Sequence, residues 1–459
     1  MKAMSRLAWG SLALLVTILI VRLVSLSFYP LMDTTEARYG EMARLMVETG
    51  NWLTPLFDYN VPFWGKPPLH TWMSALGLTV FGDNEFAVRV PHWLAAVATL
   101  ALSGYFAKRL KIDAIKTCII LSTCVVFYVS AGAVMTDMAL TFGLTLAMVG
   151  FYLCWQGEVR WGYWGFVGLA IGLLAKGPVV IVIMTIGVGL WLIWSQGLIQ
   201  PWSRLWQKIP LLSGLALMLA IAAPWYLLAE QATPGFLQYF LVGEHWLRFV
   251  DSGWTGDLYG SAHDEPRGTI WLFFAVAALP WSAFIPLALW RIFNSDSGLT
   301  SLHQFLICWM VAPMVLFTLA GNVLPAYVLP GIPALALLLA SAWPKTNLPG
   351  QTAIAIAIPL LIVATVVLLN SGPTKLKSDK WLLTPVPKGE SVYYLGKRPF
   401  SSRFYSEGKS KTMTEDELSA MAAVRYWLVV KQAQISELNL SYCTAVRETK
   451  EKQLLQCQP

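Results

Sequence analysis

The chain has 459 residues, of which 56% are hydrophobic and only 13% are charged, whereas soluble domains carry about 25% charged residues. This composition excludes an ordinary water-soluble globular protein. The net charge of +7 does not indicate nucleic-acid binding, because the sequence has no stretch rich in Lys and Arg with interleaved aromatic residues.

Residues 1–370 contain a series of apolar segments of about 17 to 22 residues, the length that crosses the hydrocarbon core of a bilayer. We therefore predict an all-α polytopic membrane domain over this range. Its eleven predicted transmembrane helices lie near residues 8–29, 86–107, 115–132, 138–156, 161–175, 178–196, 209–229, 270–291, 302–320, 324–342 and 352–370.

Basic residues indicate the orientation of these helices, because loops rich in Lys and Arg stay in the cytoplasm. The basic residues that fall on one predicted side are Lys2, Arg6, Lys108, Arg109, Lys111, Lys116, Arg160, Arg204, Lys208, Arg291 and Lys345. That side, with the N-terminus, is predicted to be cytoplasmic. An odd number of helices then puts the C-terminus and the loops 30–85 and 230–269 on the outer face.

The tail, residues 371–459, is predicted to be a separate domain on the outer surface. Strand-like runs at 391–395 and 426–430 alternate with a helix that begins at a capping box, Thr414 with Glu417, and ends near residue 423. This alternation predicts a small α/β unit.

Two of the six cysteines, Cys443 and Cys457, lie in this tail. If the tail is outside, it lies in a compartment that oxidises thiols, and we predict a disulfide between them. The other four cysteines fall in predicted transmembrane helices, where they act as small apolar packing residues.

The first motif follows the first apolar segment and runs from Asp33 through Glu36 and Arg38 to Tyr39. A structural interpretation is that Asp33 caps an interfacial helix and Glu36 completes a capping box. A functional interpretation is that an acid at the outer end of a transmembrane helix serves a reaction at the membrane surface as base or anchor. Both remain open from the residues alone.

The other candidates are charged residues of the outer face. Lys66 precedes two prolines, which hold its backbone extended, and a rigid cation suits a phosphate; the alternative is a lysine that extends to the interface. Asp137 lies between two apolar segments and could be a turn residue. Lys176 lies at another outer turn. Glu244 and His245 are adjacent, and such a histidine is more often hydrogen-bonded than bound to metal.

Two absences restrict the energy source of any reaction. The sequence contains no Asp-x-Asp pair to hold a nucleotide-sugar through a metal, and no Gly-x-x-x-x-Gly-Lys-Ser/Thr motif to hold ATP. A membrane enzyme without nucleotides needs a substrate that is already activated, and a lipid phosphate that carries a sugar fits this need.

Six motifs in order resemble the C-type superfamily of integral membrane glycosyltransferases over roughly residues 10 to 345. The branch with the greatest resemblance is the lipid A aminoarabinose transferase and protein O-mannosyltransferase group. The motifs are Asp-x-x-Glu-x-Arg-Tyr, Lys-Pro-Pro-Leu, the Asp137 that opens the fourth segment, Ala-Lys-Gly-Pro, Glu-His-x-x-Arg-Phe, and Leu-Pro-x-Tyr-x-Leu-Pro-x-x-Pro-Ala-Leu-Ala at 324–336.

The resemblance implies an inverting glycosyltransferase of the bacterial inner membrane, active on the periplasmic side. The donor would be a polyprenyl phosphate that carries a sugar such as aminoarabinose, and the acceptor lipid A or another envelope molecule. It implies that Asp33 and Asp137 are the two acids of the cavity and that Lys66 and Arg248 clamp the lipid phosphate. The further substrate-binding residues are Glu36, Arg38, Tyr39, Lys176, Glu244, His245 and Tyr327.

Two positions depart from the family pattern. Gly65 stands where the family often has Glu, and Val323 where it often has Lys. No cofactor is required by the sequence, and the missing Glu leaves any divalent metal without assigned ligands.

A lipid transporter is the alternative from another class, because it would use the same outer cavity without chemistry. Transporters coupled to ion gradients normally carry ionisable groups near the middle of their helices, and here only Arg22 lies clearly inside a predicted helix. This comparison favours the enzyme.

Overall fold

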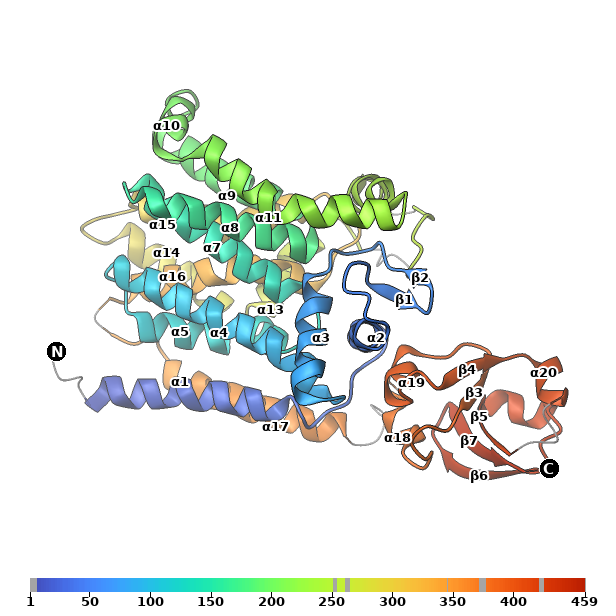
Figure 1. Ribbon diagram of the computed structural model, residues 1–459. Helices are drawn as coiled ribbons and strands as arrows, with labels where there is room; N and C mark the ends of the chain where they lie inside the picture. The colour runs from blue at the N-terminus through green and yellow to red at the C-terminus, as the bar shows by residue number, and fades with distance from the viewer. Residues whose placement is uncertain are drawn as a thin grey trace.

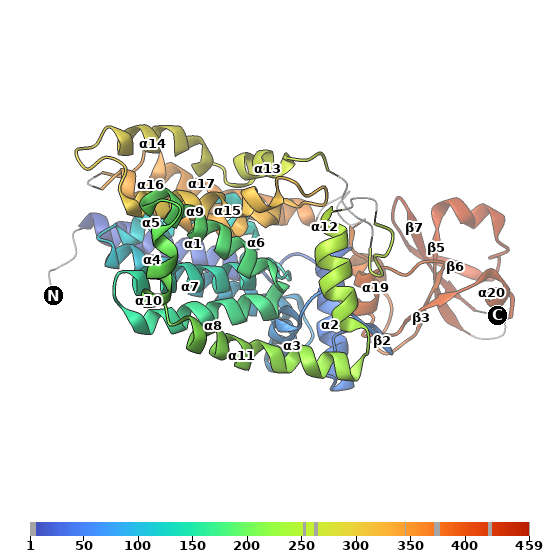
Figure 2. The ribbon, with the colours of Figure 1, turned by 90° about the horizontal axis from the view of Figure 1, so that it is seen from above.

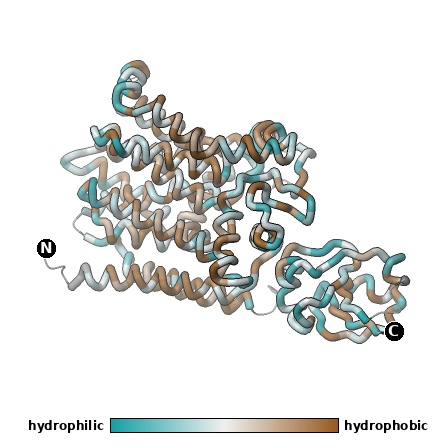
Figure 3. The backbone as a smooth tube through the Cα atoms, viewed as in Figure 1, coloured by the Kyte–Doolittle hydropathy of each residue, from teal (hydrophilic) through white to brown (hydrophobic). Residues whose placement is uncertain are grey.

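The computed structural model describes residues 6–250, 254–260, 265–344, 346–370, 377–420 and 425–458. Figure 1 shows two parts: helices that run roughly side by side, and a small unit with a sheet beyond one end of them. The helices are predominantly hydrophobic along their length, whereas the small unit is mixed (Figure 3). This matches the predicted division into a helical membrane part and an α/β tail.

The described helices of the membrane part include helices within each predicted segment and further helices between those segments. They are α1 (Arg6–Ser25), α2 (Thr35–Thr49), α3 (Leu69–Phe81), α4 (Glu85–Arg109), α5 (Ala114–Thr123), α6 (Val125–Ser130), α7 (Asp137–Trp155), α8 (Val159–Lys176), α9 (Val179–Gln196), α10 (Gln200–Lys208), α11 (Leu211–Ala232), η1 (Gln238–Leu247), α12 (Arg248–Val250), α13 (Thr269–Ala277), η2 (Trp281–Phe284), α14 (Ile285–Phe293), α15 (Ser301–Phe317), η3 (Pro325–Gly331), α16 (Ile332–Ala342) and α17 (Gln351–Leu369). A short hairpin of β1 (Leu56–Asp58) and β2 (Val61–Pro62) lies between α2 and α3.

Six of these helices are long and apolar enough to cross a membrane, within the part of the chain that the structure describes. They are α4, α7, α9, α11, the joined η3 and α16, and α17. Apolar helices at 9–25, 114–123 and 301–317 are shorter. The count of eleven therefore remains a prediction.

Two predicted continuous helices are broken. The segment 270–291 bends by 97° between α13 and η2, at Pro280, which has no N–H to continue the helix. The segment 115–132 breaks at Cys124, between α5 and α6. The backbone N–H of Val125, at one break, donates to the carbonyl of Leu279, at the other break, at 3.0 Å. Backbone groups that lose their partners within the helices therefore bond to each other.

Small residues bring α7 and α8 into backbone contact. A Cβ added at Gly143 would lie 2.7 Å from the carbonyl oxygen of Gly168, and one at Gly150 would lie 2.6 Å from the backbone nitrogen of Gly165. Helices inside membranes associate closely where such small residues face each other. These two helices fix the positions of Asp137, the first residue of α7, and Lys176, the last residue of α8.

Arg89 of α4 holds the segment that leads from α1 into α2. It has no exposed surface. Its guanidinium donates to both carboxylate oxygens of Glu36 at 2.9 and 2.8 Å, and to the carbonyls of Leu26, Tyr29 and Pro30 at 2.7 to 3.0 Å. All the N–H groups of a guanidinium are directed at this segment, which fixes the start of α2.

The two predicted outer loops and the tail lie at the same end of the helices. In Figures 1 and 2, α2, the β1–β2 hairpin and α12 lie beside the tail, whereas the start of α1, α10 and α14 lie at the opposite end. Which of the two ends faces the cytoplasm remains a prediction.

The tail contains a five-stranded sheet in the order β4-β3-β5-β7-β6. Strands β3, β4 and β5 are parallel, and β5, β7 and β6 pair antiparallel. Its elements are α18 (Lys380–Leu383), β3 (Val392–Leu395), α19 (Phe400–Tyr405), β4 (Ser410–Met413), α20 (Glu415–Ala420), β5 (Tyr426–Lys431), η5 (Gln432–Glu437), β6 (Cys443–Glu448) and β7 (Lys452–Cys457).

The local expectations for the tail agree with this sheet. Both predicted strands are present as β3 and β5, and Thr414 and Glu417 exchange two hydrogen bonds at the start of α20, as a capping box does. The predicted end of that helix near residue 423 lies outside the described residues. Cys443 and Cys457 face each other on neighbouring strands and form a disulfide.

Candidate active site

The first predicted motif does not form a helix cap. The N-cap of α2 is Thr34, and no side chain caps it. The carboxylate of Asp33 instead accepts hydrogen bonds from the backbone N–H of Ser401, at 3.0 Å, and from its hydroxyl, while Glu36 is committed to Arg89. The structural interpretation of this motif, a capping box, is therefore wrong, because Asp33 bonds the tail and Glu36 pairs with the buried guanidinium of Arg89.

Asp33 therefore joins the membrane part to α19 of the tail. Burial raises the pKa of its carboxyl, although the hydrogen bonds from Ser401 act in the opposite direction. Further ion pairs hold the same interface: Asp58 of β1 lies 2.6 Å from Arg398 and 3.2 Å from Arg403. The tail is attached by charged side chains as well as by the chain itself.

A pocket of about 390 Å³ opens at the same end of the helices, between α9, the η1–α12 segment, the end of α15 and η3. Six of the predicted site residues line it, although they are separated by up to 261 positions. These residues are Lys66, Lys176, Glu244, His245, Arg248 and Tyr327.

Glu244 lies between two cations of this pocket. Its carboxylate is 3.2 Å from the ammonium of Lys66 and 3.0 Å from the guanidinium of Arg248, and only 5% of its side chain is exposed. Burial by itself would raise the pKa of Glu244, but Lys66 and Arg248 outweigh it and lower the pKa below the usual range. The carboxylate is thus ionised and neutralises part of the positive charge.

Gly65 provides the room for this arrangement. A Cβ at Gly65 would lie 2.8 Å from the ring of Phe63 and 3.3 Å from a carboxylate oxygen of Glu244. A larger side chain at this position would therefore press on both neighbours. The glycine fits the position that Glu244 takes beside Lys66.

Lys176, the third cation, pairs with Asp137. The ammonium lies 2.6 Å from the Asp137 carboxylate and 4.0 Å from the centre of the Tyr327 ring. Asp137 is the first residue of α7, Lys176 the last of α8, and the close glycine contact of these helices brings them together. Asp137 is buried. Its connection to the pocket is its ion pair with Lys176, which lines the pocket.

His245 is held between two backbone carbonyls. Its ring nitrogens lie 2.8 Å from the Phe240 oxygen and 3.2 Å from the Lys176 oxygen, and burial lowers the pKa of the imidazole. These bonds join η1 to the end of α8. Among the described residues no group of three or more His, Cys, Asp or Glu side chains is arranged to hold a metal ion.

Arg38 and Tyr39 lie outside the lining of the pocket. The Arg38 guanidinium donates to the carbonyl of Tyr259 at 2.8 Å and covers the rings of Tyr39 and Phe63. Like Asp33 and Glu36, these two residues are not brought to the pocket in this structure, and their role in a site stays a prediction.

Sequence reasoning missed one acid of the site. Asp257 lies 3.2 Å from the guanidinium of Arg248, but in the sequence it was only one of many outer acids, and no spacing or motif distinguished it. The three negative charges of these acids, Asp257, Glu244 and Asp137, balance the three positive charges of Lys66, Lys176 and Arg248.

One wall of the pocket is apolar. The side chains of Val179, Val182, Leu241 and Phe249 lie beside the charged group. An amphipathic pocket of this kind suits an anionic headgroup with a long aliphatic chain.

Fold and pocket together define a polytopic helical membrane protein with a pocket at one end that is lined by three cations and an apolar wall. The chain belongs to the family of dolichyl-phosphate-mannose-protein mannosyltransferases, whose family model matches residues 8–240.

Curated relatives agree with this family. The chain is 31% identical to the undecaprenyl phosphate-alpha-4-amino-4-deoxy-L-arabinose arabinosyl transferase of Erwinia tasmaniensis over 331 residues, 69% of this chain and 56% of that one. Its identity to the enzyme of the same name from Edwardsiella ictaluri is 31% over 393 residues, 83% of this chain and 67% of the other. The chain thus spans less than three fifths of the first relative.

Solved structures agree in fold. ArnT from Cupriavidus metallidurans superimposes with a TM-score of 0.80 in the apo state and 0.78 when bound to undecaprenyl phosphate. Each comparison covers 98% of both chains at 18% and 17% identity. At such identity the likeness establishes the fold.

The Asp33–Ser401 contact generates a prediction about the tail. Asp33→Asn and Ser401→Ala remove parts of the same charged hydrogen-bond pair, which is worth about 1.5–3 kcal/mol. Each is expected to reduce the hydrogen-exchange protection of α19, and the double variant should be little worse than either single one. Additive losses would show that the two residues act separately.

Proposed function

We propose that this protein is an inverting glycosyltransferase that moves a sugar, such as aminoarabinose, from a polyprenyl phosphate to lipid A or another envelope acceptor. The observation that carries the proposal is the pocket in which three cations lie beside an apolar wall. Membership of the mannosyltransferase family and the names of the curated relatives support the reaction class.

We further propose that the membrane part, residues 1–370, crosses the bacterial inner membrane eleven times. Its N-terminus would be cytoplasmic and the tail, residues 371–459, periplasmic. The helical ends that carry most basic residues lie opposite the tail (Figure 1), which supports this orientation. The disulfide of the tail suits an oxidising compartment.

The donor phosphate would lie between Lys66 and Arg248, with its polyprenyl chain along Val179, Val182 and Phe249. Lys176 and Tyr327 would face the sugar from the other wall. In the reaction the acceptor oxygen bonds to the anomeric carbon while the bond from that carbon to the phosphate oxygen breaks. The cations stabilise the charge that develops on the leaving phosphate.

The acceptor decides whether a base is needed. A hydroxyl must lose its proton as it attacks, which a carboxylate would accept, and base catalysis contributes about 10²–10⁴ in rate. Asp137 and Asp33 are the acids that the resemblance assigns to this role. Asp137 contacts the lining residue Lys176 directly, whereas Asp33 bonds Ser401, so Asp137 is the proposed base. An acceptor phosphate is already anionic and needs no base.

Glu244 would compete with the phosphate for Lys66 and Arg248. The donor is a phosphodiester with one negative charge, whereas the product, a phosphate monoester, carries about −1.5 to −2 at pH 7. Because of this extra negative charge, the product binds Lys66 and Arg248 more tightly than the donor does. A carboxylate that returns to both cations would help to release the product.

The orientation can be tested by single-cysteine labelling in spheroplasts. An impermeant reagent is expected to label cysteines placed in the loop 30–85 and in the tail, because both are proposed to be outside. The loop 108–116 should react only after the membrane is opened. Labelling of 108–116 in intact spheroplasts, without labelling of the tail, would contradict the orientation.

The activity can be tested with purified protein in nanodiscs, supplied with polyprenyl-phosphoryl aminoarabinose and lipid A. Mass spectrometry should detect the transferred sugar. Lys66→Met should weaken polyprenyl-phosphate binding about 10- to 100-fold, since a charge-assisted hydrogen bond is worth about 1.5–3 kcal/mol. Lys388→Met is the control, because that side chain is 92% exposed on the tail. Binding without transfer, together with movement of the lipid across liposomes, would identify a transporter.

Glu244→Gln tests the competition for the cations. We expect the product polyprenyl phosphate to bind about tenfold more tightly, because a charge about 4 Å away contributes about 1–4 kcal/mol. The first turnover should persist while steady-state turnover falls. Asp257→Asn should give a smaller gain, since Asp257 pairs with one cation, Arg248, whereas Glu244 pairs with two. Unchanged or weaker product binding by Glu244→Gln would refute this role.

A further inference from the structure

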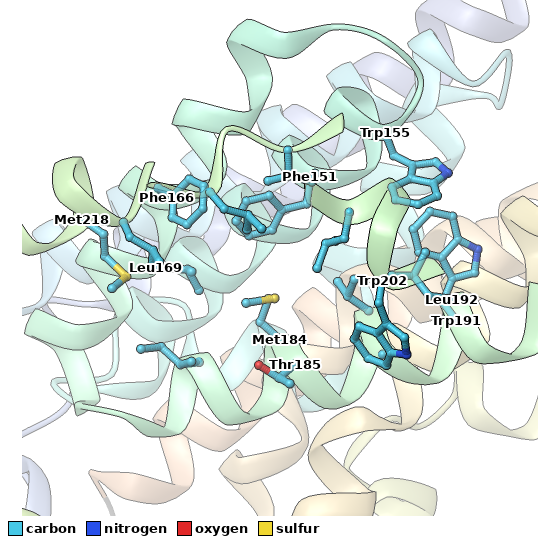
Figure 4. A pocket seen from close by; sticks show the side chains of 17 residues that line it. Phe151, Trp155, Phe166, Leu169, Met184, Thr185, Trp191, Leu192, Trp202 and Met218 are labelled. Carbon is cyan, nitrogen blue, oxygen red and sulfur yellow. The ribbon is translucent and has the colours of Figure 1, made fainter. Parts of the chain in front are cut away.

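A second cavity, of about 200 Å³, lies among α7, α8, α9, α10 and α11. It uses α9 from Ile181 to Leu192, whereas the proposed active site uses only the first turns of that helix. Figure 4 shows its side chains, among which Thr185 supplies the only hydroxyl. No charged residue is among those that line it.

This cavity suits an aliphatic chain. Apolar cavities do not retain water, because water finds no hydrogen-bond partners there. The cavity is also accessible from outside the protein, since two lining side chains are substantially exposed, Trp202 by 48% and Leu215 by 40%. In a bilayer the surrounding medium at such an opening is lipid.

The helix α10 brings positive charge to the edge of the cavity. Trp202 and Leu205 of α10 line it, and the same helix carries Arg204 and Lys208 and no acidic residue. The Lys208 ammonium donates to the carbonyl of Trp155 at 2.9 Å and lies 4.8 Å from the ring of Trp155, which is itself a lining residue.

Aromatic side chains place this edge at the level of a membrane surface. Trp194, Trp202 and Trp206 are 48%, 48% and 64% exposed, and exposed tryptophans gather where hydrocarbon meets headgroups. In Figure 1 α10 lies at the end of the helices away from the tail. Cations, interfacial tryptophans and an apolar cavity therefore occur together at this end.

We propose that this cavity is a binding site for one anionic phospholipid, with an acyl chain inside the cavity and the phosphate at Lys208 and Arg204. The occupant belongs to the leaflet next to α10, opposite the leaflet that holds the proposed donor. A polyprenyl phosphate is not the occupant proposed, because the pocket with Lys66 and Arg248 lies at the other end and has its own cations.

Gly189 allows the cavity to be filled without disturbing the fold. It lines the cavity, and a Cβ added there meets no atom within 4 Å. Gly189→Leu should therefore occupy the space of the acyl chain. Gly10→Leu is the matched control, because Gly10 of α1 is also open to a Cβ but lies away from the cavity.

The test uses the full chain in nanodiscs of phosphatidylethanolamine and phosphatidylglycerol, followed by native mass spectrometry of retained lipid. Wild type and Gly10→Leu should keep one phosphatidylglycerol, and Gly189→Leu should lose it at least tenfold. The double variant Arg204→Gln with Lys208→Gln should retain lipid but lose the preference for phosphatidylglycerol. Equal retention by Gly189→Leu, or no retention by wild type, would overturn the proposal.

A second measurement needs no variant. Phosphatidylglycerol with a photoreactive group on its acyl chain should cross-link to Trp202, Leu205 or Met218 of the wild-type protein. Cross-links elsewhere only, or displacement of the lipid by added decaprenyl phosphate, would also overturn the proposal. Neither outcome depends on whether the chain transfers a sugar.

Discussion

The buried guanidinium of Arg89 is the interaction on which the end of the helices beside the tail (Figure 1) depends. It satisfies the last carbonyls after α1 and the carboxylate of Glu36 at once, and thereby fixes the chain from residue 26 to the first turn of α2. The contact of Asp33 with the tail follows from that position. Removing one partner of such a buried ion pair costs about 3–5 kcal/mol. The charge of Arg89 therefore holds α2 in place and, through Asp33, the tail.

The same constraint explains the candidate site. Cations cannot remain unpaired in a poorly solvated pocket, and each of the three here has an acid: Glu244 for Lys66, Glu244 and Asp257 for Arg248, and Asp137 for Lys176. The charges of the pocket are therefore balanced by its own side chains, and under the proposed function a phosphate would exchange places with an acid rather than meet an unpaired cation. This makes the acids part of any binding event.

Helix α9 relates the two cavities to each other. Its first turns border the charged pocket and its later turns border the apolar cavity near α10. The ends of the molecule therefore differ in chemistry: a pocket lined by paired cations and acids lies at the end near the tail, and exposed tryptophans with two cations lie at the other. A bilayer with different surroundings on its two sides accounts for this polarity.

The sequence by itself determined the helical membrane part, the tail with its strands and the side on which Lys66, Lys176, Glu244 and Arg248 meet. These features follow from local hydropathy, strand alternation and charge bias. Only the tertiary structure decided that Asp33 bonds Ser401, 368 residues away. It also decided that Glu36 pairs with Arg89 rather than caps a helix, and that one predicted helix bends at Pro280. A buried charge takes its partner from whichever helix packs beside it, and local sequence does not encode that neighbour.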